Sequence, residues 1–341
     1  MSASVERTRR EGAAASTFGA VRWALWPAMV AALVSGVAVF VNGVAVRHFD
    51  DATVYTTAKN LWAGVLLAAA LMVLPQRAEK CPGDCAQRND PGTFPSRSVA
   101  GATGRSLWPW LVVVAVIGGA VPFVLFFEGL ALATSTDAAF IHKTLVVWVA
   151  VGASIVLRER LRPAHFVAIA LLVIGHVVVS GGVSLSGVGR GEALILVATL
   201  LWTVEVLVVK RLLVAMPAQY LATVRMLGGS VVLLGWLAVR GDLAALAAFT
   251  AGQWWWLAMT GTTLAAFVSL WYRALAAAPA TDVTAVLVAG AVVTAILNTG
   301  LRGVPVTVDA VGYLVVLAGV VVVAVSSARA EAVRSARGLT S

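Results

Sequence analysis

Six of the ionisable side chains within the long apolar stretches of this 341-residue chain could carry chemistry. They are Lys59, Glu128, His142, Lys143, Glu205 and Arg225. A charge in such surroundings is costly, so these groups must face a partner or a polar cavity. They could bind a group of opposite charge, hold or transfer a proton, or form static ion pairs between helices. The sequence leaves these roles open.

The elements that carry these side chains are ten apolar stretches, each long enough to cross a bilayer as a helix, which takes about 20 residues. The sequence thus predicts an all-α membrane protein with ten transmembrane helices. Their expected ranges are 23–46, 52–74, 108–132, 136–157, 164–181, 191–213, 218–239, 252–277, 281–300 and 308–327.

The composition agrees with a membrane protein. The chain is 60% hydrophobic and 12% charged, whereas soluble domains have about 25% charged residues. The net charge is +9, but the positive residues lie between the apolar stretches and not on one basic face, which argues against nucleic-acid binding. With the N-terminus inside, 18 Lys and Arg residues fall on the inner side and 4 on the outer side. The positive-inside rule therefore predicts that both termini are cytoplasmic.

The two halves of the chain repeat one another. Thr136-Asp137 recurs 145 residues later as Thr281-Asp282, and Gly175 recurs 144 residues later as Gly319. In the same register Lys59 corresponds to Arg225. Because each copy holds five spans, an odd number, the second copy must be inverted in the membrane. Inverted repeats are a recurring plan for alternating access.

At these residues the chain resembles the EamA family of the drug/metabolite transporter superfamily. The most specific segment is 131–161, which ends in Arg158, Glu159, Arg160 and Leu161, and the segment 269–281 resembles the family's turn between helices 8 and 9. The resemblance implies two inverted five-helix repeats around a central cavity, and transport of small organic metabolites, often export. The chain departs from the family pattern in two places: its fourth helix has no proline, and its second repeat has Gly303 where the first repeat has Glu159.

Five segments follow from these observations. We expect an N-terminal cytoplasmic tail over 1–22 and a C-terminal one over 328–341. The first repeat spans 23–181 and includes a cytoplasmic loop over 75–107, and the second repeat spans 191–327. The first span is too long for a cleaved signal peptide.

Counting residues from the span ends predicts two charged clusters. The outer cluster would hold Lys59, Glu128 and Lys143, with His142 near them. The inner cluster would hold Arg225 and Arg273, with Glu205 near them. Glu205 could be a proton-coupling carboxylate or a partner for a neighbouring helix.

Some backbone features also carry expectations. Pro122 should bend the third span, and the glycine pairs 118–119 and 228–229, with Gly290, should allow close helix packing. Asp137 and Asp282 are expected to cap the fourth and ninth helices.

The function expected from all this is secondary active transport of a small organic, anionic or zwitterionic metabolite through the inner membrane of a bacterium, with export and proton coupling as the favoured mode. A passive channel, a lipid scramblase and a non-transporting regulator are the alternatives. The motifs of an enzyme, a cofactor or a metal site are absent from the sequence, and Cys81 and Cys85 are expected to be reduced thiols. The expected partners are a small-molecule substrate, protons and lipids, as either a monomer or a homodimer.

Overall fold

The computed structural model describes residues 26–73, 107–133, 141–142, 144–159, 161, 163–179 and 189–302, with isolated positions between 312 and 326. The predicted tails over 1–22 and 328–341 and nearly all of the predicted loop over 75–107 lie outside this part of the chain. Every element within the described residues is a helix, as the apolar pattern predicts.

The first half supplies five helices in sequence order. The first helix spans Trp26–His48 and ends in the short η1 (Val46–His48). It is followed by α2 (Ala52–Val73). The third helix has three parts: α4 (Trp108–Val113), the π-helical η2 (Val114–Gly118) and α5 (Val121–Leu132). The fourth comprises α7 (Leu145–Gly152) and the π-helical η3 (Ala153–Leu157). The fifth is α8 (Pro163–Val179).

The second half follows the same plan. It begins with α9 (Arg190–Leu212). The seventh helix consists of α10 (Ala218–Thr223), the π-helical η4 (Val224–Gly228) and α11 (Gly229–Arg240), and the short η5 (Leu243–Ala247) leads on to α12 (Ala251–Ala277). The ninth helix is divided into α13 (Ala280–Leu287) and α14 (Gly290–Arg302). Of the tenth, the described positions between 312 and 326 are helical.

Five of these helices are long and apolar enough to cross a membrane: Trp26–His48, Ala52–Val73, Trp108–Gly129, Arg190–Leu212 and Ala218–Arg240. Where the ends of a predicted span are described, they agree with the helices to within a few residues, whereas the start of the fourth span and most of the tenth lie outside the described residues. The sequence did not predict the division of the ninth helix at Val288–Ala289.

Equivalent helices of the two halves run in opposite directions. Helix α2 starts next to Asp51, whereas the seventh helix ends at Arg240, and Arg240 Nη2 lies 2.8 Å from Asp51 Oδ2. We call this end of the bundle the Asp51 end. The opposite end, where η3 leads into α8, is the Glu159 end. The second copy is therefore inverted relative to the first.

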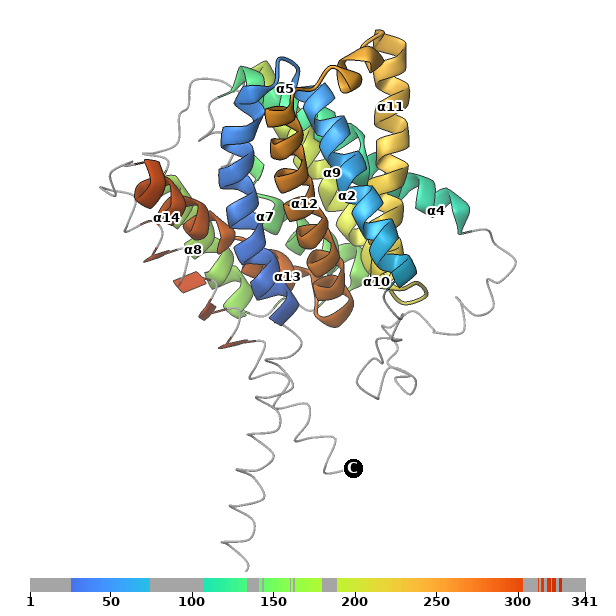
Figure 1. The fold of residues 1–341 in the computed structure, drawn as a ribbon. Coiled ribbons are helices and arrows are strands. Elements are labelled where there is room, and N and C mark those ends of the chain that lie inside the picture. Colours follow the sequence, from blue (N-terminus) through green and yellow to red (C-terminus); the bar gives the residue numbers. More distant parts are fainter. Residues whose placement is uncertain are drawn as a thin grey trace, which may run out of the picture.

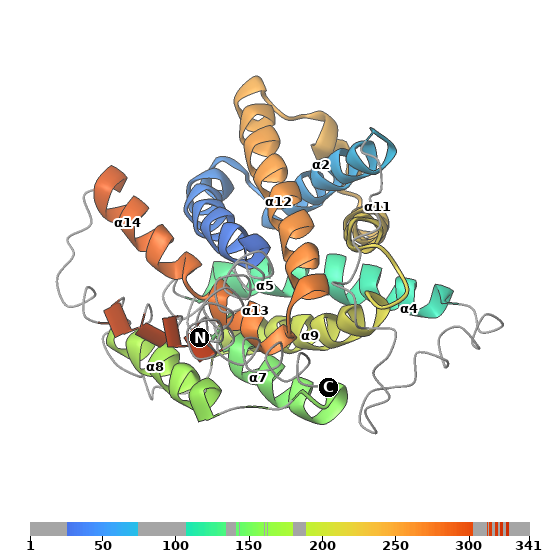
Figure 2. The ribbon, with the colours of Figure 1, turned by 90° about the horizontal axis from the view of Figure 1, so that it is seen from below.

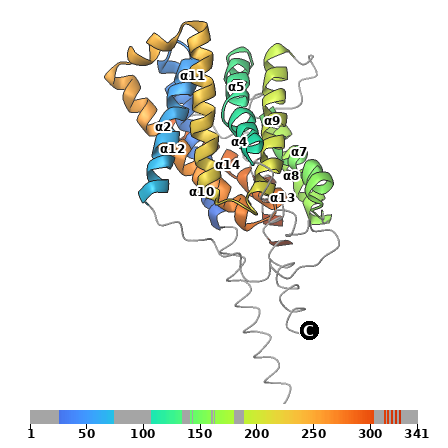
Figure 3. The ribbon, with the colours of Figure 1, turned by 90° about the vertical axis from the view of Figure 1, so that its right-hand side faces the viewer.

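The helices pack as one bundle. Figure 3 shows α2 next to α11 and α5 next to α9, and these pairs are in contact. Helix α12 lies against α2 (Figure 1). Seen from below, α8 and α14 lie on the side of the bundle away from α11 (Figure 2). The main core lies between α2, α5, α9, the seventh helix and α12, where residues such as Met226, Val268 and Tyr272 are fully buried.

Asp51 organises the Asp51 end. Its Oδ1 accepts hydrogen bonds from the backbone N–H groups of Thr53 (2.6 Å) and Val54 (2.9 Å), so it caps α2. Arg240 holds Asp51 and also contacts Asp242 at 2.8 Å. Desolvation by partial burial would raise the pKa of Asp51, but these backbone and guanidinium donors outweigh it, so the pKa lies below its usual value of 3.8.

Candidate functional site

The third helix is interrupted in the middle of the bundle. Pro122 has no N–H group, so the carbonyl of Gly118, four residues earlier, has no helical partner. The N–H groups of Phe123 and Val124 both bond to Ala120, which also releases the carbonyl of Gly119. The expected bend at Pro122 is thus present, and it exposes two carbonyl oxygens to neighbouring helices.

Three side chains from other helices donate to these two carbonyls. Arg225 Nε donates to Gly118 O at 3.1 Å, and Trp202 Nε1 donates to the same oxygen at 3.2 Å. Asn60 Nδ2 donates to Gly119 O at 3.3 Å. The interruption therefore connects α2, α9 and η4 to the third helix through buried polar contacts.

Glycines allow the backbones to meet at this point. A Cβ on Gly119 would lie 2.0 Å from the carbonyl oxygen of Arg225, and one on Gly229 would lie 2.4–2.5 Å from backbone atoms of Gly119. A Cβ on Gly118 would lie 2.8 Å from Cγ of Glu205. The expectation that these glycines permit close packing is confirmed, because no other residue fits there without moving the backbone or Glu205.

Arg225 belongs to a buried group of charged and polar side chains. Glu205 Oε1 accepts a hydrogen bond of 2.5 Å from the Tyr272 hydroxyl and lies 3.9 Å from Arg225 Nε. The guanidinium carbon of Arg225 is 5.9 Å from the centre of the Tyr272 ring and 6.0 Å from that of Phe123. Glu205 and Arg225 are 1% and 6% exposed. We call Glu205, Arg225 and Tyr272 the Arg225 group.

The prediction placed Glu205 near Arg225, and the structure brings the two together. It also adds Tyr272, which the sequence did not single out. Arg273, the other residue expected near them, is only partly buried.

Lys59 forms a second buried charge. It is 3% exposed, and its Nζ donates to Asn42 Oδ1 at 3.0 Å. The ammonium group also lies 4.8 Å from the ring centre of Tyr55 and 4.5 Å from that of Phe127. These are cation–π distances. Among the described residues no carboxylate forms an ion pair with Lys59.

The neighbours of Lys59 differ from those expected. Glu128 was expected beside it, but the Glu128 side chain is exposed. The two side chains are separated by the rotation of the third helix, which directs Phe127 and not Glu128 toward Lys59. His142 is half-buried and lies 5.1 Å from Trp202 and 5.4 Å from Phe126, ring centre to ring centre. Lys143 lies outside the described residues.

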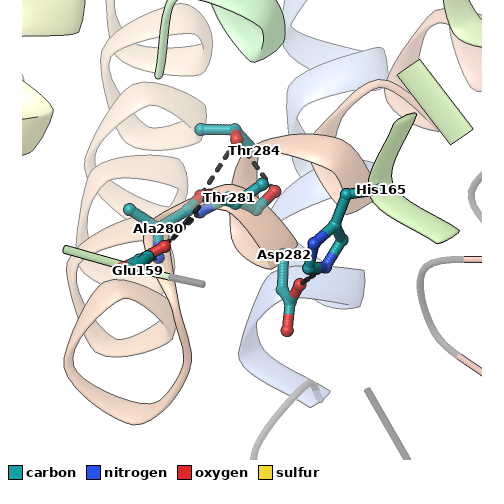
Figure 4. A network of polar contacts seen from close by, with 6 residues as sticks. All are labelled: Glu159, His165, Ala280, Thr281, Asp282 and Thr284. Carbon is teal, nitrogen blue, oxygen red and sulfur yellow. Dashed lines mark hydrogen bonds and ion pairs between the residues drawn. The ribbon is translucent and has the colours of Figure 1, made fainter. Parts of the chain in front are cut away.

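A polar network missed by the sequence lies at the Glu159 end (Figure 4). Glu159 accepts hydrogen bonds from the backbone N–H groups of Ala280 (2.9 Å) and Thr281 (3.3 Å) and from the Thr281 hydroxyl (3.0 Å). His165 Nε2 lies 2.8 Å from Asp282 Oδ1, and both side chains are buried. Asp282 lies in the first turn of α13, where its charge complements the helix dipole as expected. Hydrogen bonds from the first N–H groups of α13 are accepted by Glu159, from the other half of the chain. The only sequence signal was the resemblance of the segment around Glu159, since the pairing joins residues about 120 positions apart.

The centre of this duplicated, inverted helical bundle holds buried cations, a carboxylate, phenol groups and freed carbonyls. This combination is typical of one class of protein, the multi-pass membrane transporters with a central polar site. Sequence comparison then places the chain. The profile of the EamA-like transporter family matches residues 22–181 and again residues 189–325. The chain belongs to this family, within the drug/metabolite transporter superfamily, and it is a membrane transporter and not an enzyme.

Other comparisons agree with the fold. One solved structure, described only as the crystal structure of a protein, matches with a TM-score of 0.65 and 16% identity. The match covers 88% of this chain and 97% of that one. At this identity the likeness shows the fold alone. No curated protein matches the sequence.

Proposed function

We propose that this transporter carries a small organic metabolite with a carboxylate or other negative group, either anionic or zwitterionic. The observation that carries the proposal is the excess of buried positive charge along the bundle centre. Lys59 and Arg225 are both buried, whereas the central helices offer them one buried carboxylate among the described residues, Glu205. A buried cation held by an amide and two aromatic rings gains from an anionic ligand.

The Arg225 group supports alternating access with proton coupling. Arg225 Nε already bonds to a backbone carbonyl, and its contact with Glu205 is long, at 3.9 Å. A substrate carboxylate could take the place of Glu205 beside the guanidinium group. The ionised Glu205 carboxylate would then pair with the ammonium group of a zwitterionic substrate, whereas a protonated Glu205 could not, so that binding of the substrate and binding of a proton would exclude one another. Tyr272 lies at hydrogen-bond distance to either form of Glu205. One proton would then be exchanged for one substrate.

The direction and location of transport form part of the proposal. The distribution of Lys and Arg supports an orientation with the Glu159 end and both termini in the cytoplasm of a bacterium and the Asp51 end outside its inner membrane. In that orientation outward exchange for protons gives export. His142, Lys143 and Glu128 remain proposed as lining or gating residues, and the sequence is compatible with a monomer or a homodimer.

Reconstituted protein tests the proposal. Uptake into proteoliposomes is measured for a panel of amino acids, organic acids and cationic dyes, with and without a proton gradient. We compare the wild type with Lys59→Gln and, as a matched control, with Arg47→Gln, whose side chain is exposed at the Asp51 end. Saturable uptake of an acidic or zwitterionic compound that Lys59→Gln abolishes and Arg47→Gln retains supports the proposal.

Other outcomes assign the chain differently. Saturable uptake of a cationic dye alone, unaffected by Lys59→Gln, refutes the substrate class. Flux without saturation favours a passive channel or a scramblase. Folded protein with no flux for any compound favours a non-transporting regulator.

A further inference from the structure

At the Glu159 end, side chains of the first half of the chain contact the start of α13 in the second half. Glu159 and His165 belong to the first half, and Ala280, Thr281 and Asp282 to the second. In Figure 4, Glu159 and His165 approach the start of α13 from two sides. We call Glu159, His165 and Asp282 the α13 latch.

Helix α13 depends on this latch for its first turn. The residue before it, Pro279, offers no side-chain cap, and the first N–H groups of any helix lack partners within the helix. The Glu159 carboxylate bonds to two of them and places negative charge at the positive end of the helix dipole. The start of α13 is therefore held by the opposite half of the protein.

The backbone before Glu159 is shaped for this contact. Arg158, at the end of η3, has φ 55° and ψ 31°, a left-handed conformation that is unfavourable for a residue with a side chain. The N–H of Glu159 then bonds back to Ala153 O at 3.0 Å, which ends the helix. This turn directs Glu159 to α13, where its hydrogen bonds offset the local strain.

The other end of α13 is built as a hinge. At Val288 and Ala289 the N–H groups bond to carbonyls three residues earlier, so the α-helical ladder is interrupted. Beyond the interruption, α14 is fixed to the first helix: Thr294 Oγ1 donates to Gly36 O at 2.9 Å, and a Cβ on Gly290 would lie 2.7 Å from Ala32 O. Thus α14 is held by the first helix, whereas α13 is held by the latch and by packing against α7, with fewer contacts to α9 and α12.

We infer that the α13 latch is the gate of the Glu159 end, and that this end opens when Glu159 and His165 release α13 and it turns about Val288–Ala289. The inference rests on the proposed alternating access, because only a carrier that opens at both ends must break these contacts. Glu159 and His165 act as gating residues that need not touch the substrate.

Thiol labelling at α13 tests the gate without knowledge of the substrate. In protein with Cys81→Ser and Cys85→Ser, a Thr284→Cys substitution places one thiol at a position that is 2% exposed. We expect slow labelling by a small maleimide. Adding Glu159→Gln or His165→Asn should raise the labelling rate by roughly 5- to 30-fold, the factor that corresponds to a loss of about 1–2 kcal/mol of stabilisation of the closed state. Glu192→Gln is the matched control, because Glu192 lies in the first turn of α9 at the other end of the bundle.

The outcomes are distinct. Unchanged labelling in both latch variants overturns the gate, as does an equal rise in Glu192→Gln, which would indicate general loosening. Uptake on the same variants separates this result from the proposed function, since saturable uptake with unchanged labelling overturns the gate alone.

A second measurement covers variants that do not fold. The double substitution His165→Cys and Asp282→Cys is joined by a short bifunctional methanethiosulfonate. Transport should stop and return on reduction. Continued transport by fully cross-linked protein overturns the inference.

Discussion

The crossing of the third and seventh helices at Gly119 and Gly229 gives a quantitative prediction for Gly229→Ala. The new Cβ would lie 2.4–2.5 Å from backbone atoms of Gly119, whereas ordinary contacts begin at 3.4 Å. The two helices must therefore separate by about 1 Å, which forfeits a quarter to a half of each affected dispersion contact. Because both sides of the contact are backbone, no side chain can move to relieve it.

Two consequences add to the cost. Overpacking of this kind destabilises by about 1–3 kcal/mol. The separation also lengthens the bond from Arg225 to Gly118 (3.1 Å) and shifts the Gly119 carbonyl relative to Asn60 of α2, its donor at 3.3 Å, and each bond is worth about 1 kcal/mol or more. We expect Gly229→Ala to lose roughly 3–5 kcal/mol of unfolding free energy.

Gly235→Ala, in the same helix α11, is the matched control. No atom lies within 4 Å of its Cβ position, so the change should be neutral or stabilise by up to about 1 kcal/mol through helix propensity. Thermal unfolding in detergent, followed by tryptophan fluorescence and by size-exclusion chromatography after heating, measures the difference. At about 2 °C per kcal/mol, Gly229→Ala should melt roughly 6–10 °C below the wild type. If both variants melt together, the close backbone contact at this crossing is refuted.

Two further predictions concern ionisable groups. The Asp51 pKa is lowered in the folded state, so its contribution to stability is complete above the unfolded value of about 3.8 and is lost as the pH falls through the folded value. Asp51→Asn should therefore have a lower unfolding free energy than the wild type at pH 7 but an equal one at the acid end of a stability–pH series. A deficit that persists at acid pH, or one that the control Asp50→Asn at the exposed neighbouring position shares, contradicts this. Tyr272→Phe removes the hydrogen bond to the buried Glu205 carboxylate and should cost about 1.5–3 kcal/mol in unfolding free energy. Tyr220→Phe, at an exposed position, should cost little, and equal costs in chemical denaturation would disprove the role of the bond.

Span positions, duplication and family could be predicted from the sequence because they depend on local composition. Apolar runs of membrane length do not need tertiary contacts to be recognised, and the break at Pro122 follows from its missing N–H. The position of Arg225 beside Glu205 could also be anticipated, because counting from the span ends places both at a similar depth.

The sequence could not place what depends on pairing between distant segments. Depth alone put Glu128 with Lys59, but rotation about the helix axis leaves one exposed and the other buried. The capping of α13 by Glu159 has no local pattern, because Glu159 precedes Ala280 by 121 residues and Pro279 offers no side-chain cap. The division of the ninth helix at Val288–Ala289 could not be predicted, because no proline lies at or next to these residues.

The polar face of α2 has a consequence for the assembly of the protein in the membrane. This helix is the least apolar of the five long spans, because its buried face carries Thr53, Thr56, Thr57, Lys59 and Asn60. Alone in lipid it would expose an ammonium group, at a cost of a few kcal/mol. Asn42 of the first helix accepts hydrogen bonds from Lys59 and from the Tyr55 hydroxyl, and the two helices are joined by a turn of only three residues, 49–51. The first two helices thus form a hairpin that can partition into the bilayer as one unit, with the lysine already bonded to Asn42 and lying over the Tyr55 ring before Phe127 of the third helix adds its contact.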